Sequence, residues 1–493
     1  MMVLSNKSHD VASTFGIIIL GLFSIFYVIF GSVFAEMHLK VSFLDFPIFM
    51  GEVLLFICFI FFIFRYKKIK KISRRSSVCL ILYLIFILTK AMWGYFIWGP
   101  LALRHAALFY YPFFAVFSYF FYSSEYFDGK RKVLILLIIL SMFVFWVFKP
   151  YWLYGCLCVS LLFALSFSNK WLKNIFVLLI LICMPYKYLF ETSRMGMLSN
   201  LISIIFVISI LSIIFLSNKK KWVKVDVTSI LILLVFLGFY KMVDKPIFLS
   251  IFNIVQMKQM ISRYDNKLNE GLKNFTFRDL KVGLYNENLD YQLFYYKLVQ
   301  KERKALEVRV AMKDSMADVD SVIVDSDKAK GDQSEKKSAN EERVDYKMAN
   351  IVFRLFIWTD ILDDIKAEKK IFGIHFGKPF RSKRLEILDW GTMDWQRDGW
   401  IAAHNSYLNL IYRGGIVGVI LILYIFVILF RLIKYFIAER LISGILLCSV
   451  IIYWLVSANF LVILELPQYA IPFWSLYGFT FAYYLDKKKT ILI

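Results

Sequence analysis

Long apolar runs recur along the chain and are separated by short polar turns, except for one long polar interval between residues 241 and 405. A helix needs about 20 mostly apolar residues to cross a hydrocarbon core about 30 Å thick, and most of these runs approach that length. The runs that we identify are roughly 12–34, 46–64, 78–96, 106–122, 133–148, 151–168, 175–190, 199–217, 227–240, 416–431, 441–463 and 470–485. The pattern therefore predicts an all-α polytopic membrane protein with about 12 transmembrane helices and one large extracytoplasmic loop.

The long polar interval divides the chain into three predicted parts. Residues 1–240 are expected to form an N-terminal bundle of about nine helices, residues 241–405 a loop domain, and residues 406–493 about three C-terminal helices. Within the loop, residues 313–347 carry 17 charged residues out of 35 and almost no aromatic residues. Such a segment cannot bury enough apolar surface to order itself, so we predict a disordered insertion at 313–347.

The basic residues predict how the helices are oriented in the membrane. Residues 65–75 carry seven positive charges, and further basic groups fall in the turns at 130–132, 219–224, 431–434 and 487–489. All of these turns lie on one side if about twelve spans are counted, and Lys and Arg concentrate on the cytoplasmic side of a membrane. Both termini are therefore predicted to be cytoplasmic, and the loop 241–405 to be extracytoplasmic.

Composition narrows the class of protein further. Hydrophobic residues make up 59% of the chain, and its net charge is +22. Because the positive charge follows the predicted topology, it requires no nucleic-acid partner, although basic turns also attract anionic lipid headgroups. The six cysteines lie in apolar runs and are typical of small core residues, with no second pair to complete a zinc site. No cleavable signal peptide is expected, because the first apolar run is too long for one.

One short segment places polar chemistry next to a predicted membrane span. His404, Asn405 and Ser406 come shortly before the apolar run 416–431, at the end of the long loop. An imidazole changes protonation near neutral pH, and the bilayer surface is where a lipid-borne substrate would arrive. His404 is therefore a candidate catalytic base. The alternative interpretation is a loop histidine that helps to start a helix.

Three arginines are candidate anion-binding residues on the same predicted face. Arg194 lies at the outer mouth of the eighth span, Arg354 flanks a helical stripe of apolar residues in the loop, and Arg104 lies at the outer end of the fourth span. A guanidinium group can bind two phosphate oxygens at once through paired hydrogen bonds, and it stays charged at neutral pH. The alternatives are a snorkelling side chain for Arg194, a solvated loop charge for Arg354 and an interfacial anchor for Arg104.

The order of these motifs resembles the O-antigen ligase and polymerase superfamily over about residues 192–422. The motifs are Ser-Arg at 193–194, Arg-Leu-Phe-Ile-Trp at 354–358, Phe-Gly-Ile-His-Phe-Gly at 372–377, His-Asn-Ser-Tyr-Leu at 404–408 and Gly-Gly-Ile-Val-Gly at 414–418. The number of predicted spans is similar to that of the ligase branch. The chain departs from the family in the insertion 313–347, and in Arg413, where many relatives carry an acidic residue.

The resemblance implies a GT-C-like glycosyltransferase of the bacterial inner membrane, with its active site on the extracytoplasmic face. Its donor would be a glycan linked to undecaprenyl diphosphate, and transfer would be inverting and metal-independent, with no cofactor. His404 would take the proton from the attacking hydroxyl, while Arg194 and Arg354 would stabilise the leaving diphosphate. Further substrate-binding candidates are Arg104, Asn405 and Arg413.

Two branches of this family, the polymerases and the ligases, differ in the acceptor that they use, and the motifs match both. A polymerase would transfer the growing glycan to a new lipid-linked repeat unit, whereas a ligase would transfer it to lipid A–core in lipopolysaccharide or to a protein hydroxyl. We favour the polymerase slightly, because surface polysaccharides of many kinds require one. A flippase and a chain-length regulator are implied as partners. A lipid-linked glycan flippase or another transporter is the alternative from a different class, but few polar residues lie at mid-membrane depth.

Overall fold

A computed structural model of the protein describes residues 15–24, 26–27, 30–39, 48–65, 74–99, 101–121, 352–388 and 403–492, with a few single positions between 199 and 270. Most of the predicted spans between 133 and 240, the insertion 313–347 and Arg194 lie outside the described residues. The chain divides into two compact units, of which the first comprises Met1–Ile254, Trp358–Ser382 and Met393–Ile493, and the second Val255–Ile357 and Lys383–Thr392. The predicted division at residues 240 and 405 stays a prediction.

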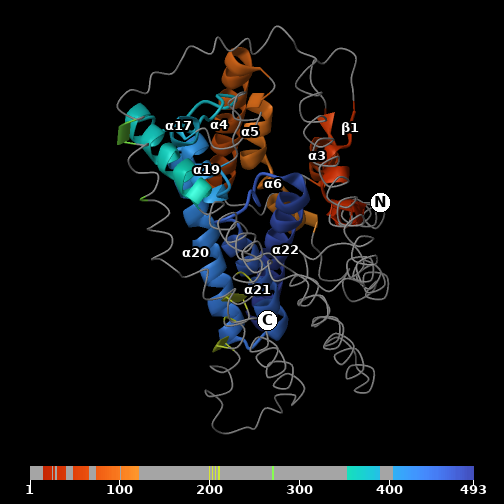
Figure 1. The fold of residues 1–493 in the computed structure, drawn as a ribbon. Coiled ribbons are helices and arrows are strands. Elements are labelled where there is room, and N and C mark those ends of the chain that lie inside the picture. The colour runs from red at the N-terminus through yellow and green to blue at the C-terminus, as the bar shows by residue number, and fades with distance from the viewer. Residues whose placement is uncertain are drawn as a thin grey trace, which may run out of the picture. The chain divides into compact units, whose positions relative to one another are not determined.

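The described part of the chain is mostly helical (Figure 1). The helices of the first unit include Phe15–Ser24, α2 (Ser32–Glu36), α3 (Met50–Arg65), α4 (Arg74–Trp98), α5 (Leu101–Tyr110), α6 (Phe113–Phe121), α19 (Ser406–Gly414), α20 (Ile416–Ala438), α21 (Ile442–Ser457) and α22 (Pro467–Leu492). The second unit contains α17 (Lys383–Ile387). Residues 352–368 are also helical, and of these 352–357 belong to the second unit and 358–368 to the first. A two-stranded antiparallel sheet, β1 (His38–Leu39) with β2 (Ile48–Phe49), is a small departure from the all-helical prediction.

Two of the described helices are long and apolar enough to cross a membrane. They are Ser77–Trp98 and Ile416–Ala438, with mean hydropathies of 1.9 and 3.0. Both coincide with predicted runs, and both leave large apolar side chains exposed, such as Phe96 at 80% and Phe430 at 68%. Surfaces of this kind suit a hydrocarbon environment better than water. The full number of about twelve spans stays a prediction.

The predicted run 106–122 is divided into two helices in the structure. α5 ends at Tyr110 and α6 begins at Phe113, with a turn at Tyr111 and Pro112 between them. Proline has no backbone N–H, so the chain cannot continue the helical hydrogen bond to the carbonyl four residues earlier. The amide of Phe114 instead donates to the Tyr111 carbonyl at 2.9 Å. The periodicity alone concealed this break, because the side chains on both sides of it are apolar.

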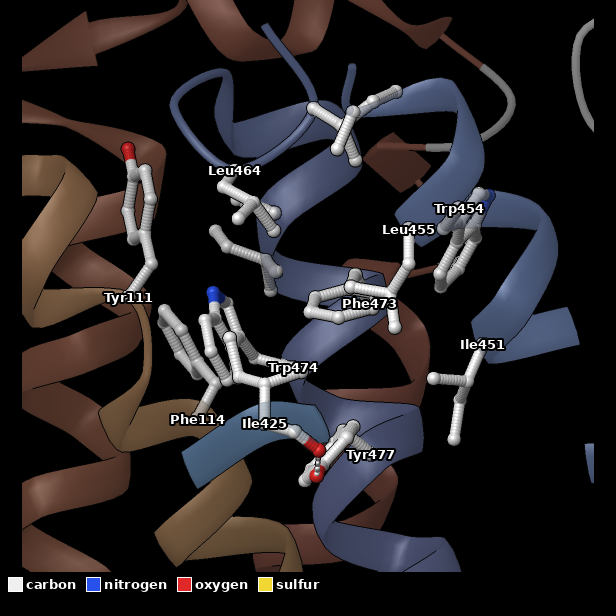
Figure 2. Packing of buried hydrophobic residues seen from close by; sticks show 14 of the residues in the cluster. Tyr111, Phe114, Ile425, Ile451, Trp454, Leu455, Leu464, Phe473, Trp474 and Tyr477 are labelled. Atoms are coloured by element: carbon white, nitrogen blue, oxygen red, sulfur yellow. Dashed lines mark hydrogen bonds between the residues drawn. The ribbon is translucent and has the colours of Figure 1, made fainter. Parts of the chain in front are cut away.

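The core of the first unit forms where α22 packs against α6 and α21. Gly478 of α22 lies so close to α6 that a Cβ atom added there would be 2.0 Å from the Ala115 carbonyl oxygen. Trp474, Phe114 and Phe473 are buried in this region (Figure 2). The Tyr477 hydroxyl donates to the Ile425 carbonyl of α20 at 2.7 Å, which satisfies a phenol that is otherwise surrounded by apolar groups.

Candidate functional site

The candidate site is organised around α19, the short helix that follows His404. Asn405 is the N-cap residue of this helix, and its side-chain oxygen accepts a hydrogen bond from the Leu408 amide at 3.0 Å. An asparagine at this position satisfies an amide that would otherwise lack a partner, and such a cap typically contributes about 1 kcal/mol. Asn405 therefore has a structural role, and its predicted role in substrate binding stays a prediction.

The residues on both sides of His404 are held by long-range hydrogen bonds. The indole N–H of Trp358 donates to the Ala403 carbonyl at 2.8 Å, and the Ser406 amide donates to the Ala458 carbonyl at 2.8 Å. The fully buried Ser406 hydroxyl donates to the Leu461 carbonyl and accepts from the Leu464 amide. The start of α19 is thus bound to the chain that connects α21 and α22. This segment is part of the folded helical unit rather than a solvated loop.

His404 itself has an unusual backbone conformation. Its φ angle is +48°, in the left-handed region that non-glycine residues rarely adopt. The other described non-glycine residues with positive φ are Lys369 and Arg440, and both directly follow helices, where this conformation is common. His404 instead precedes a helix, so its strain is maintained by the bonds of its neighbours. Strain of this kind, of order 1–3 kcal/mol, is often found at functional sites.

The motif at 372–377 lies directly against the end of α19. The Ile374 amide donates to the Tyr412 carbonyl at 2.7 Å, and the Ile416 amide donates to the Ile371 carbonyl at 2.8 Å. Phe376 is fully buried and stacks on Phe109 of α5, with ring centroids 5.2 Å apart. The 372–377 and 414–418 motifs are therefore in contact, although about forty residues separate them in the sequence.

The same segment is also bound to α5. The Gly377 amide donates to His105 Nδ1 at 2.8 Å, so this nitrogen carries no proton and His105 is a neutral tautomer protonated at Nε2. Gly377 has a φ angle of +84°, and a Cβ atom there would lie 2.5 Å from the side chain of Trp98. Only glycine fits this approach without displacing its neighbours.

Lys90 and Arg413 hold the segment in place through hydrogen bonds to its carbonyl groups. The Lys90 ammonium group on α4 donates to the carbonyls of Phe372 and Arg413, the second of which belongs to the last turn of α19. A cation at this end is favoured by the helix dipole. Arg413 is 3% exposed, and its Nη1 donates to the carbonyls of His375 at 3.1 Å and Lys378 at 2.7 Å. These contacts give Arg413 a structural role, and its predicted substrate contact stays a prediction.

The structure gives fewer contacts for the other arginines that the sequence analysis named. Arg104 lies on α5, one residue before His105, with its guanidinium carbon 4.2 Å from the centroid of the Phe49 ring. Arg354 is half-buried in the second unit, and burial lowers its pKa. Arg194 lies outside the described residues. The structure thus brings together the C-terminal end of α19, the 372–377 motif and the α5 region, while His404 lies before the opposite end of α19. The roles of the arginines stay predictions.

His375 lies in a basic environment within the 372–377 motif. Burial, followed by the charges of Lys370 and Lys90, lowers the pKa of His375, so its imidazole is neutral at pH 7. Glu368 forms ion pairs with Lys370 at 2.8 Å and with Lys378. The cations near His375 are therefore largely occupied by carbonyls and by this carboxylate. This arrangement favours a structural role for them over direct anion binding.

Glu465 is a further titratable group that the sequence analysis did not identify. It lies between α21 and α22, directly after Leu464, whose amide donates to Ser406. Burial raises the pKa of Glu465 to about 7, although the hydrogen bond with Asn409 and the charge of Arg413 act in the opposite direction. Its Oε1 atom is buried and has no hydrogen-bond partner among the described residues. The available signal was a single acidic residue between two apolar runs.

The raised pKa of Glu465 predicts that stability depends on pH. Folding favours the protonated carboxyl group, so its stabilising contribution is complete below its ordinary value of 4.5 and is lost as the pH rises through about 7. The melting temperature of the purified protein should therefore fall from about pH 5 to about pH 8, and the Glu465→Gln variant should show a smaller fall. Glu439→Gln, at an exposed position, is the matched control. Equal slopes for Glu465→Gln and the wild type would contradict this prediction.

Among the described residues, no group of three or more His, Cys, Asp or Glu side chains could hold a metal ion. The comparisons with known proteins add no assignment. No protein-family model matches the chain, and searches among curated proteins and solved structures found no similar protein. The resemblance to the O-antigen ligase and polymerase superfamily therefore stays a prediction from the motifs.

Proposed function

We propose that the chain is a membrane glycosyltransferase that moves a glycan from an undecaprenyl diphosphate carrier to an acceptor hydroxyl. The observation that carries this proposal is the strained backbone of His404, held by hydrogen bonds of its neighbours at the start of α19. The short helix α19 leads directly into α20, which is long enough to cross a membrane. An imidazole in this place would meet a substrate that arrives within the membrane. We further propose that the membrane is the bacterial inner membrane, with both termini cytoplasmic and the site on the extracytoplasmic face.

The proposed reaction needs one base and groups that stabilise negative charge. Neutral His404 would accept the proton of the acceptor hydroxyl while that oxygen attacks the anomeric carbon. The bond between the anomeric carbon and the phosphate oxygen would break at the same time, and the electron pair would leave with the diphosphate. Arg194 and Arg354 would stabilise the charge that develops on this leaving group. Attack from the opposite face inverts the anomeric configuration.

Several features support a positioned base over the alternative of a simple helix-starting histidine. Asn405, rather than His404, caps α19, so the start of the helix does not require an imidazole at 404. The hydrogen bonds at Ala403 and Ser406 fix the backbone on both sides of His404. A base must be held within hydrogen-bond reach of the proton that it takes, and a fixed backbone supplies this condition. The polymerase remains the slightly favoured acceptor assignment.

Transfer by the purified protein tests the proposal. The wild type is reconstituted into liposomes with a lipid-linked repeat unit, and the release of undecaprenyl diphosphate and the length of the glycan product are measured. A polymerase should lengthen the glycan with this substrate alone, whereas a ligase should require added lipid A–core. Addition of a chelator should leave the rate unchanged. Movement of the intact lipid-linked glycan across the bilayer, without release of the diphosphate, would identify a transporter and overturn the proposal.

A further inference from the structure

A second set of polar side chains lies at the start of α3, outside the segment 403–415. Glu52 is in the first turn of α3, where the helix dipole favours a negative charge. The Tyr110 hydroxyl donates to Glu52 Oε1. The other carboxylate oxygen, Oε2, is buried and has no hydrogen-bond partner among the described residues. A buried carboxylate oxygen without a donor costs free energy, so this atom indicates a place for a ligand or water.

Two tyrosine hydroxyls converge on the residue before Glu52. A Cβ atom added at Gly51 would lie 3.3 Å from the hydroxyl oxygen of Tyr27 and 3.3 Å from that of Tyr111. Tyr27 is 0% exposed, and its hydroxyl also lacks a hydrogen-bond partner within the described part of the chain. Glycine at 51 therefore permits both phenols to approach α3 next to the Glu52 carboxylate.

The helix α22 contributes a third unpartnered group, about one helical turn from the point where α22 meets α3. The Ile471 Cδ1 atom would lie 3.4 Å from a Cβ atom at Gly51, which places this face of α22 against α3. Gln468 lies three residues earlier on the same face of α22. It is 8% exposed, and its Oε1 atom is buried with no hydrogen-bond partner in the described ranges.

The chemistry of these atoms indicates which ligand would fit. An amide oxygen such as Gln468 Oε1 accepts hydrogen bonds and cannot donate them, and the same holds for Glu52 Oε2 in an ionised carboxylate. The Tyr27 hydroxyl can accept or donate. Acceptors require a ligand that brings donors, as the hydroxyl groups of a sugar do. A phosphate would place negative oxygens against the carboxylate, which is unfavourable. Arg104 lies close to Tyr110 and Glu52, because the charges of Arg104 and Glu52 both act on the Tyr110 hydroxyl.

We propose that Glu52, Tyr27 and Gln468 form a subsite that binds the hydroxyl groups of a neutral sugar. The proposal rests on the proposed function only in taking this sugar to be part of a transferred or accepting glycan. Glu52 would accept from one hydroxyl while Tyr110 holds its other oxygen. Tyr27 and Gln468 would then bind neighbouring hydroxyls. The subsite determines which sugar is held, and His404 has no part in it.

Saturation-transfer NMR on the purified protein tests the subsite directly. The probes are methyl β-glucoside, methyl β-galactoside and N-acetylglucosamine, with inorganic phosphate as a competitor. The wild type should bind at least one of the sugars, and phosphate should not displace it. Glu52→Gln should weaken binding about tenfold or more, because a hydrogen bond to a charged acceptor is lost, and Tyr27→Phe should weaken it about fivefold. Tyr435→Phe removes another buried hydroxyl without a described partner and should bind like the wild type.

The outcomes separate this proposal from the proposed function. His404→Ala should keep full sugar binding, so loss of transfer with normal binding concerns the base and not the subsite. No binding of any probe by the wild type would overturn the subsite. Equal binding by the wild type and both subsite variants would do the same, as would displacement of the sugar by phosphate. If Glu52→Gln does not fold, the conservative Tyr27→Phe variant and its Tyr435→Phe control decide the question.

Discussion

The His404→Ala variant should transfer glycan about 10²–10⁴-fold more slowly than the wild type, because general-base assistance accounts for a factor of this size. Binding of the lipid-linked donor should survive, since the proposed phosphate contacts are elsewhere. Asn405 rather than His404 caps α19, so the helix should still form and the melting temperature should change little. The measurement is the initial rate of diphosphate release by purified, reconstituted protein.

Two further variants show what His404 does. Glutamine can donate a hydrogen bond but cannot take a proton near neutral pH, so His404→Gln should be nearly as slow as His404→Ala. His375→Gln is the matched control, because His375 is the other histidine described in residues 352–388 and 403–492. It should keep most of the activity. A His404→Gln variant with a rate close to the wild type would reduce His404 to an orienting group and remove the base from the mechanism.

The Gly415→Ala variant should lose much of its folded state. Gly415 has φ +55° and ψ −129°, a backbone conformation that is essentially restricted to glycine. A Cβ atom there would lie 2.0 Å from the Ile371 carbonyl oxygen and 2.4 Å from the Gly373 amide nitrogen. These are backbone atoms and cannot rotate away. We expect a destabilisation of more than about 3 kcal/mol, from strain together with the loss of the hydrogen bond between Ile416 and Ile371.

Gly21→Ala is the matched control for this substitution. Gly21 lies in the helix Phe15–Ser24, and a Cβ atom there would meet nothing within 4 Å. Alanine is the better helix former by up to about 1 kcal/mol, so this variant should melt at the same temperature as the wild type or slightly above it. Both variants are compared by thermal unfolding in detergent and by the yield of monodisperse protein. A Gly415→Ala protein as stable as Gly21→Ala would show that the 371–374 segment can separate from α19 without loss of the fold.

The helices were the part of the fold that was most accessible from the sequence. The runs 78–96 and 416–431 correspond to α4 and α20, because an uninterrupted apolar stretch of this length is a local property of the chain. The alternative interpretation of His404 as a residue that helps to start a helix had the same local basis, although in the structure Asn405 is the N-cap. The break between α5 and α6 could have been predicted from Pro112, which the apolar pattern around it obscured.

Only part of the candidate site could be predicted from the sequence. His404 stood out from its residue type and its position before an apolar run, but its strained conformation is visible only in the structure. Arg413 resembled a substrate-binding cation in the sequence, whereas the structure buries it and directs Nη1 to the carbonyls of His375 and Lys378. The sequence alone did not indicate a role for Glu465, because it is a single acidic residue between two apolar runs. Its significance depends on burial beside Asn409 and Arg413, which no spacing rule predicts.

By itself, the sequence determined where apolar helices form, because this depends on side chains within a few turns of one another. Only the tertiary structure decided which partners the buried polar groups have. Lys90 meets the carbonyls of Phe372 and Arg413 across separations of 282 and 323 residues, and Ser406 meets Leu461 across 55. A polar group removed from water must find a partner, but any of many carbonyls would satisfy it. The packing of α4, α19 and the segment 371–377 selects among them, and packing depends on shape over the whole folded unit rather than on local sequence.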